Sequence, residues 1–295
     1  MLYLYQWVLI SLKTNNNSTI MKNIFLFSIL FSVVLSSSCS KMDFSRTENV
    51  WLESMEKQKL IPTDVIAFKA GMEVLSSYDS QVDVSKYPGA FWAVKAGKYI
   101  ISTGFYTQGR YKLENIASGE TGYFLQYPDH PKFPKIDEET KAIMYASNVL
   151  RLRPDNEAFV CGTMYSGVLE ICKIQNDQIF AVKQLNLHYP KVYIQKSKAK
   201  DKYPTVAFSR DNFFGFTDIF TTQDRIYTIY SGKTFRENQK NIQEGSFLMV
   251  FDWNGNLLKS FELSVPLTLL KYNEEEKAIF GQRFRENYLI KYLLP

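Results

Sequence analysis

The chain has 295 residues, of which 45% are hydrophobic and 22% charged, and its formal net charge is +5 at pH 7. This composition supplies enough apolar side chains for a large core and excludes a chain that is disordered throughout. The charges are too evenly balanced for a nucleic-acid-binding domain, which usually carries a strongly basic face.

Residues 21–38 have the layout of a signal peptide. The segment begins with Met21 and Lys22, continues as an apolar run over Ile24–Leu35 and ends in three serines before Cys39. A membrane-spanning helix would need about 20 apolar residues, so this shorter run favours a cleaved export signal.

Residues 1–20 precede this signal and are interpreted as an incorrectly assigned upstream start. The alternative is a two-helix membrane anchor, which is disfavoured because neither apolar stretch reaches spanning length.

Cys39 follows small residues directly, an arrangement that resembles the lipobox of bacterial lipoproteins, although Ser36 replaces the usual leucine. In such proteins the cysteine carries a diacylglycerol and an acylated amino terminus, and several acyl chains anchor a protein stably. We expect the mature chain to begin at Cys39, with residues 39–60 as a lipidated tether and residues 61–295 as one folded domain.

Beyond the tether, short runs of alternating apolar and polar residues recur between turn residues, which predicts an all-β domain. The clearest unit, Phe213–Leu263, contains four such runs with turns such as Asn254-Gly255. The same plan recurs over Asn148–Leu187 and, less regularly, over Phe91–Tyr127. Four consecutive antiparallel strands make one blade of a β-propeller.

The last unit, Leu267–Leu294, has only three runs before the sequence ends. A closed propeller can take the missing strand from the N-terminal side of the domain, here Asp64–Phe68, so that no sheet edge stays open. About 40 to 45 residues per blade gives six blades, with five as the fallback. Further blades are therefore expected within Pro128–Ile143 and Pro190–Phe208.

Cys161 and Cys172 flank a turn predicted at Ser166-Gly167. A two-residue hairpin there would place the cysteines opposite each other in the wider, hydrogen-bonded class of pair, which disfavours a strain-free disulfide. We expect two buried free thiols, with a disulfide as the alternative.

Four short segments in the C-terminal half share the pattern of one family: Phe214–Ile219, Arg225–Tyr227, Tyr230–Lys233 and Val250–Gly255. They resemble the TolB-like six-bladed propeller lipoproteins, and the resemblance extends over Ala146–Leu294. It implies a lipid anchor and a six-bladed ring, and it brings no established activity or catalytic residues.

No catalytic residue, metal site or cofactor is predicted. The sequence has no G-x-S-x-G elbow, H-E-x-x-H helix or D-x-[DN]-x-[DN]-G calcium loop. His130 and His188 lie near prolines outside any recognisable motif, so we expect both to be structural. The acidic runs at Glu138-Glu139 and Glu274–Glu276 are expected to be solvated turns.

A basic stretch from Lys191 to Arg210 is interleaved with Tyr193 and Tyr203. Clustered lysines attract anions such as an anionic glycan, a phosphate headgroup or an acidic protein surface, although a solvated loop is the commoner outcome. Outside this stretch, Asp218, Arg283 and Arg285 lie at strand beginnings or turns that a propeller face could present. The candidate ligand-facing residues are Lys196, Lys198, Lys200, Arg210, Asp218, Arg283 and Arg285.

The sequence therefore predicts an outer-membrane lipoprotein of the cell envelope that faces the periplasm or the cell surface. It is expected to attach to the membrane through Cys39 and to bind or scaffold a protein or glycan partner, not nucleic acid. The alternative function is a hydrolase or lyase that acts on envelope glycans or peptidoglycan, and a purely structural protein is a third possibility.

Overall fold

The computed structural model describes residues 56–68, 80–195, 205–238, 240–284 and 286–295. Nearly all the regular structure in these ranges is β-strand. Within them, no helix combines the length and the apolar character that crossing a membrane requires.

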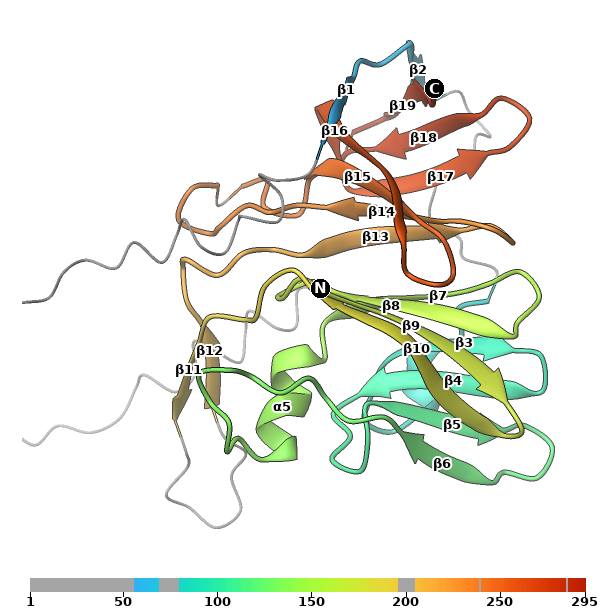
Figure 1. The fold of residues 1–295 in the computed structure, drawn as a ribbon, viewed down its shortest axis with the longest axis vertical. Coiled ribbons are helices and arrows are strands. Elements are labelled where there is room, and N and C mark those ends of the chain that lie inside the picture. The colour runs from blue at the N-terminus through green and yellow to red at the C-terminus, as the bar shows by residue number, and fades with distance from the viewer. Residues whose placement is uncertain (1–55, 69–79, 196–204, 239, 285) are drawn as a thin grey trace, which may run out of the picture. The chain divides into compact units, whose positions relative to one another are not determined.

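Four four-stranded antiparallel units, here called blades 1 to 4, form the body of the domain (Figure 1). Blade 1 contains β3 (Ala90–Ala96), β4 (Tyr99–Gly104), β5 (Tyr111–Asn115) and β6 (Thr121–Phe124). Blade 2 contains β7 (Asn148–Leu152), β8 (Ala158–Thr163), β9 (Val168–Gln175) and β10 (Gln178–Asn186). Blade 3 contains β13 (Phe216–Thr221), β14 (Ile226–Tyr230), β15 (Gly245–Phe251) and β16 (Leu257–Leu267). Blade 4 contains β17 (Leu269–Asn273), β18 (Ala278–Gln282), β19 (Tyr288–Leu293) and β2 (Asp64–Ala67). These strands confirm the predicted ones to within a few residues at each end.

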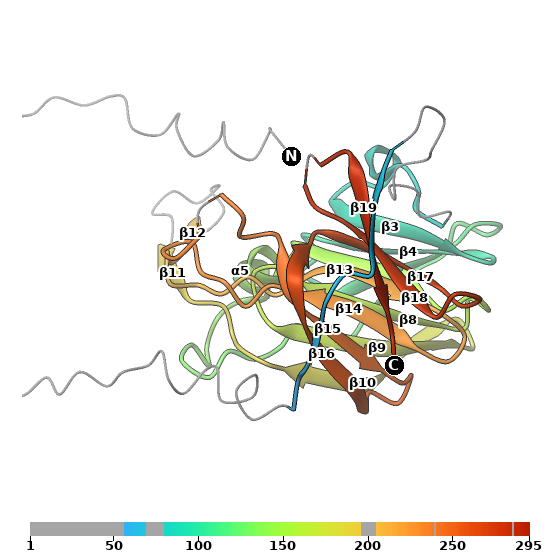
Figure 2. The same ribbon diagram turned by 90° about the horizontal axis from the view of Figure 1, so that it is seen from above.

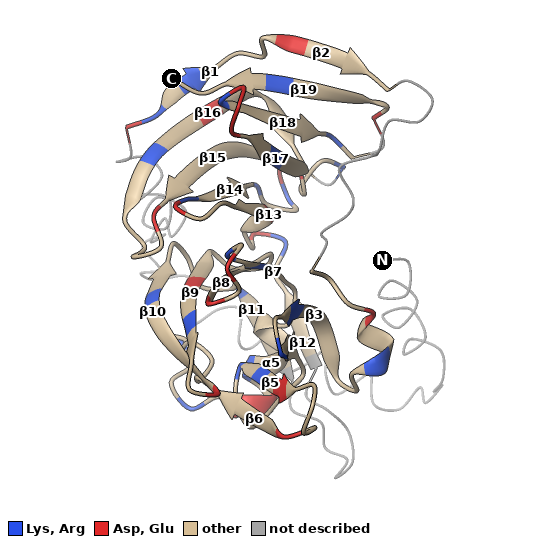
Figure 3. Cartoon of the chain, turned by 90° about the vertical axis from the view of Figure 1, so that its right-hand side faces the viewer, with Lys and Arg blue, Asp and Glu red and all other residues tan. Residues whose placement is uncertain are grey.

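The blades are arranged in chain order, and each contacts the next through its first strand. Strand β7 contacts both β3 and β13, and β13 also contacts β17. Figure 3 shows the sequence of sheets, from the β2–β19 edge to β6. One buried apolar cluster lies between each pair of neighbouring blades: the first joins blades 1 and 2, the second blades 2 and 3, and the third blades 3 and 4. The core is therefore divided among the interfaces between blades.

Strand β2 completes blade 4 by pairing antiparallel with β19, with Asp64 opposite Lys291 and Ala67 opposite Tyr288. Figures 1 and 2 show this early strand beside the last strand of the chain. The predicted closing strand Asp64–Phe68 is therefore confirmed. Just before it, β1 (Gln58–Leu60), at the end of the expected tether, adds to the outer edge of blade 3 by parallel pairing with β16.

The two segments in which further blades were expected contain other elements. The first contains α5 (Glu138–Tyr145) and, among its described residues, no strands of a further blade. The prediction of a solvated turn at Glu138-Glu139 is also wrong, because these residues begin the helix. Asp137 caps this helix by accepting the Thr140 N–H at 2.8 Å, and the two glutamates favour its first turn. The second contains β11 (Val192–Gln195) and β12 (Thr205–Phe208), which pair as a hairpin.

The register of the β8–β9 hairpin differs from the prediction. Cys161 lies opposite Glu170, and Cys172 lies opposite Phe159, so the two cysteines are not opposite each other. The connection has four residues rather than two, because the Thr163 hydroxyl accepts the Val168 N–H at 3.1 Å and closes a wider turn. Both cysteines are buried free thiols, as expected.

Candidate functional site

The two ends of the blades differ in the length of their connections. At one end the strands are joined by short turns, such as Asn254-Gly255 and Asn176-Asp177. The opposite end carries the long connections 125–147, 187–215 and 231–244, which contain α5 and the β11–β12 hairpin (Figure 1, left). We call these three connections the elaborated end.

The β11–β12 hairpin is held to the body of the domain by its inner face. Val192, Ile194, Val206 and Phe208 pack in an apolar cluster with side chains of α5 and the start of β9. Because side chains alternate across a strand, the intervening residues point outward. Tyr193 is 70% exposed and pairs with the exposed Ala207.

A series of aromatic contacts ties the hairpin to the other connections of the elaborated end. The rings of Phe208 and Tyr165 stack with centroids 4.5 Å apart, and Tyr165 meets Phe214 edge-on at 4.8 Å. Phe214 in turn meets Phe235 at 5.4 Å. Such pairs add stabilisation beyond their buried area, so they hold connections 187–215 and 231–244 together, while connection 125–147 is held by the apolar cluster under the hairpin.

Charged side chains surround the outward face of the hairpin. Arg236 donates from its Nη2 to Asp211 Oδ2 at 3.0 Å, and its backbone N–H donates to the Arg210 carbonyl at 2.9 Å. The Asp211 carboxylate raises the pKa of Arg236, and the Arg236 guanidinium lowers the pKa of Asp211. Since an exposed ion pair contributes little to stability, its main effect here is to orient two loops. We call Tyr193, Ala207, Arg210, Asp211 and Arg236 the hairpin patch.

The structure places the predicted ligand-facing residues in different environments. Cys39, Lys196, Lys198, Lys200 and Arg285 lie outside the described residues. Arg210 is exposed and belongs to the hairpin patch, whereas Asp218 and Arg283 lie elsewhere.

Asp218 does not face a ligand, because only 1% of it is exposed. Its carboxylate accepts from Arg151 Nη2 at 2.9 Å and from the Leu270 N–H at 2.9 Å. The Arg151 guanidinium also lies over the Trp92 ring at 5.1 Å. These contacts link all four blades through their first strands, so Asp218 is a structural clamp and its prediction as a ligand-facing residue is wrong.

Arg283 lies at the elaborated end with its charge already paired. It contacts Glu244 at 3.1 Å and Glu286 at 3.9 Å, and 26% of its side chain is exposed. The hydrogen bond to Glu244 raises the pKa of Arg283. This contact joins connection 231–244 to blade 4, and the prediction that Arg283 faces a ligand stays a prediction.

A second buried ion pair was missed in the sequence. Arg110 and Glu170 approach within 3.0 Å between blades 1 and 2, and the Tyr111 hydroxyl donates to Glu170 at 2.6 Å. The signal for it is an acidic residue inside the apolar run Val168–Cys172, since a charge in a buried strand needs a partner. Arg151 inside the apolar strand β7 carries the same signal.

Both histidines are buried and bonded to the backbone. His188 contacts the Phe213 carbonyl through Nε2 at 3.2 Å and the Tyr230 hydroxyl through Nδ1 at 2.9 Å. Burial lowers the pKa of His188 to about 4, so the ring is neutral at pH 7. His130 contacts the Pro190 carbonyl at 2.9 Å. Across the described ranges, no group of three His, Cys, Asp or Glu side chains could hold a metal ion.

Comparison with known proteins gives a family and a set of distant structural likenesses. A family model described as TolB-like 6-blade propeller-like matches residues 79–274. No curated protein matches the chain.

Three solved structures illustrate the structural likenesses. A member of the DUF4221 family from Bacteroides vulgatus is 13% identical with a TM-score of 0.40, over 68% of this chain and 61% of that one. BamB from Moraxella catarrhalis is 10% identical with a TM-score of 0.37, over 68% of this chain and 42% of that one. The RRP9 WD40 repeats are 11% identical with a TM-score of 0.37, over 67% of this chain and 52% of that one. The chain thus spans less than two thirds of each of these proteins.

Proposed function

Because the chain belongs to the TolB-like 6-blade propeller-like family, we propose that it is a non-enzymatic binding or scaffolding module at the cell envelope. The elaborated end is the surface that meets the partner. The partner is an envelope protein or glycan that carries negative charge.

The observation that carries this proposal is the grouping of the long connections at one end of the blades. Binding residues are commonly found on loops that a rigid scaffold positions. Here aromatic contacts join connections 187–215 and 231–244. Connection 125–147 packs against the inner face of the hairpin through the apolar cluster, so the hairpin patch is presented on a supported surface.

The composition of the hairpin patch suits an anionic partner. Exposed tyrosine and arginine are among the residue types that contribute most to protein interfaces, and Tyr193 is near enough to Arg236 to interact with it electrostatically. Arg210 and Arg236 outnumber the single acid, Asp211, and the sequence of the adjoining connection adds further lysines. Complementary charge on the partner would speed association and favour one orientation.

The buried charges support a structural use for groups that could otherwise act in catalysis. Glu170 and Asp218 are each paired with a buried arginine, and His188 is held by two hydrogen bonds. These groups stabilise the interfaces between blades, and we assign partner binding to exposed residues instead.

The test is a capture experiment from detergent-solubilised envelopes with the purified protein as bait. Tyr193→Ala and Arg236→Ala should each weaken binding of the partner, and so its recovery, at least about fivefold, the loss expected of a residue worth more than about 1 kcal/mol. Phe180→Ala is the matched control, because Phe180 is also an exposed aromatic residue, 45% accessible, on the outer strand of blade 2.

Two further treatments separate the possible outcomes. Digesting the envelopes with protease before capture removes a protein partner and leaves a glycan partner. Equal recovery with wild type and both patch variants would refute the assignment of the hairpin patch. Turnover of a glycan or peptidoglycan substrate would replace binding with catalysis.

The proposed membrane attachment rests on Cys39 and is tested separately. Intact-mass measurement of the protein from membranes should give a chain that begins at Cys39 and carries acyl groups. The Cys39→Ala variant should lose the acyl mass and leave the membrane fraction. An unmodified mass for the wild type would refute the anchor and leave the hairpin patch untouched.

A further inference from the structure

Exposed aliphatic side chains lie on the outer rim of blades 3 and 4, near the end where short turns join the strands. Leu257 and Leu258 begin β16 directly after the turn at Asn254-Gly255, and they are 37% and 43% exposed. Leu293 ends β19 and is 48% exposed, and Ile61, between β1 and β2, is 70% exposed. We call Ile61, Leu257, Leu258 and Leu293 the aliphatic rim.

Two contacts bring the parts of the aliphatic rim together. The Thr63 N–H donates to the Lys291 carbonyl at 2.8 Å, which places the connection between β1 and β2 beside the end of β19. The Lys259 ammonium donates to the Pro295 carbonyl, which joins the start of β16 to the residues after β19. Figure 3 shows the end of the chain beside β1. Exposed apolar side chains gathered in this way mark a surface that contacts a protein or a membrane.

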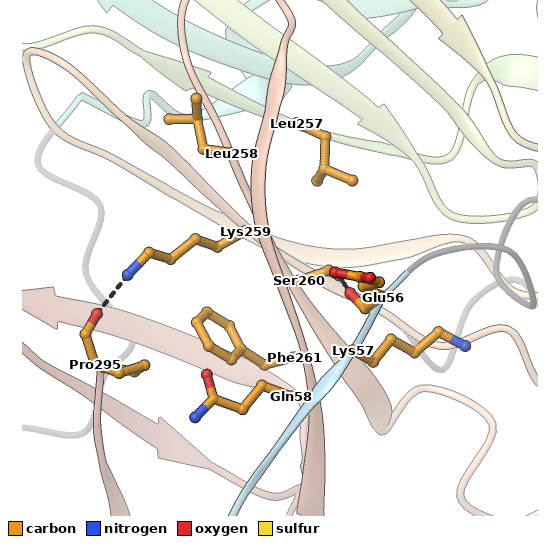
Figure 4. Close-up of a pocket in the computed structure, with 9 residues that line it drawn as sticks. All are labelled: Glu56, Lys57, Gln58, Leu257, Leu258, Lys259, Ser260, Phe261 and Pro295. Carbon is orange, nitrogen blue, oxygen red and sulfur yellow. Dashed lines mark hydrogen bonds between the residues drawn. The ribbon is translucent and has the colours of Figure 1, made fainter.

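A groove of about 720 Å³ lies within this surface, between the start of β16 and β1 (Figure 4). Leu257, Leu258 and Phe261 line it together with two lysines, Lys57 and Lys259. A lysine keeps its ammonium in water while its methylene chain covers apolar surface. Aliphatic side chains next to lysines therefore suit the boundary between lipid headgroups and acyl chains.

The described chain enters the domain at this groove. The Ser260 hydroxyl donates to the Glu56 carbonyl, and the Lys57 ammonium lies 5.0 Å from the centre of the Phe247 ring. Glu56 follows Cys39 by 17 positions, so even a fully extended chain between them spans about 60 Å at most. An acylated Cys39 therefore keeps the groove close to the membrane and makes a lipid surface the partner that the aliphatic rim meets most often.

We propose that the aliphatic rim docks on the membrane that holds Cys39, with Leu257 and Leu258 inserted at the lipid boundary. The acidic turn Glu274–Glu276 joins β17, the innermost strand of blade 4, to β18. The domain therefore meets the lipid with its outer rim and keeps these charges away from anionic headgroups. The elaborated end lies at the opposite end of the strands, where it is free to meet the proposed partner. The inference rests on the proposed anchor for proximity, but the apolar contact itself requires no acyl chain.

Hydroxyl-radical footprinting on vesicles tests the docking without relying on native acylation. The chain expected after export, Cys39–Pro295, is coupled through Cys39 to a maleimide lipid in vesicles of phosphatidylethanolamine and phosphatidylglycerol. The two other cysteines are buried and should not react. The leucines of the aliphatic rim should be oxidised at least about fivefold more slowly than in solution, because docked side chains lie about 5–10 Å inside the headgroup boundary.

A paired substitution separates docking from simple shielding by the vesicle. Leu257→Ser with Leu258→Ser removes the apolar contact, and Leu293 should then regain its rate in solution. Phe105→Ser is the matched control, because Phe105 is a 55% exposed side chain that follows β4 at the opposite end of the strands. This variant should leave Leu293 protected, and Phe105 itself should be oxidised equally on vesicles and in solution.

Three results would overturn the proposal. One is unchanged oxidation of the rim leucines on vesicles, and another is equal protection of Phe105. The third is a dimer in solution, measured by analytical ultracentrifugation, that Leu257→Ser with Leu258→Ser abolishes, since this would assign the aliphatic rim to a second copy of the chain. A native mass without acyl groups, together with protected leucines, would remove the anchor at Cys39 and leave the docking surface in place.

Discussion

Replacing Asp218 by alanine should destabilise the protein strongly. The Asp218 carboxylate is 1% exposed and neutralises Arg151, whose side chain is 6% exposed. Removing it leaves a buried guanidinium without its counter-charge and the Leu270 N–H without its acceptor. Loss of one member of a buried ion pair costs about 3–5 kcal/mol. This is a large part of the about 5–15 kcal/mol by which domains are usually stable.

Urea unfolding, followed by fluorescence and circular dichroism, measures this loss. Asp218→Asn also removes the counter-charge of Arg151 but retains an acceptor for the Leu270 N–H, so it should lose less stability than Asp218→Ala. In the double variant Arg151→Met with Asp218→Asn the unpaired charge is gone, so stability should recover above that of Asp218→Ala.

Two results would refute the stabilising role of the Asp218–Arg151 ion pair. One is a loss below about 1 kcal/mol in Asp218→Ala, which is what a surface carboxylate would give. The other is strict additivity of the Arg151 and Asp218 substitutions in a double-mutant cycle, which would mean that the two side chains do not interact.

Three further predictions concern buried groups. Unfolded His188 binds a proton below its ordinary pKa of 6.5, whereas folded His188 binds one only near 4. Stability should therefore fall by about 3 kcal/mol from pH 8 to pH 4, and His188→Gln should remove this part of the slope in urea titrations at each pH. Gly215→Ala should cost more than about 3 kcal/mol, because its Cβ would lie 1.9 Å from a backbone oxygen. At Gly97 an added Cβ would meet open space, and only the positive φ of +57° is unfavourable, so Gly97→Ala should cost only about 1–2 kcal/mol. Equal melting temperatures for the Gly215 and Gly97 variants would contradict the close packing at Gly215. Burial raises the pKa values of the Cys161 and Cys172 thiols, so both should resist thiol reagents until urea unfolds the chain, and labelling of the native protein would contradict this burial.

The blades could be predicted because their strands depend mainly on local pattern. Strand β7, for example, begins at Asn148, the first residue of the predicted unit Asn148–Leu187. The closing strand β2 could be predicted by counting, because a three-stranded last blade requires a fourth strand from elsewhere. Both inferences need only alternation, turn residues and the requirement that sheet edges be covered.

The remaining features depend on contacts between distant segments. Asp218 and Arg151 are 67 residues apart, so the sequence marks each as a charge within a strand and does not mark their pairing. Helix α5 spans only eight residues, too few for a clear helical period. The register of the cysteine hairpin is set by one hydroxyl, that of Thr163, which widens the turn. The hairpin patch was only partly indicated, because Arg236 enters it from a connection that the basic stretch does not include.

The pairing of β2 with β19 also sets the order in which the domain can be completed. The Thr63 hydroxyl bonds to the Lys291 carbonyl 228 residues later, so the fourth blade needs both ends of the domain. Blades 1 to 3 each draw their four strands from one continuous stretch and can form in order as synthesis proceeds. Blade 4 cannot form until the last strand has been released, because closing so long a loop must precede its contacts. A chain that is still being synthesised therefore keeps this sheet open, and the domain closes only when β19 is free to pair with β2.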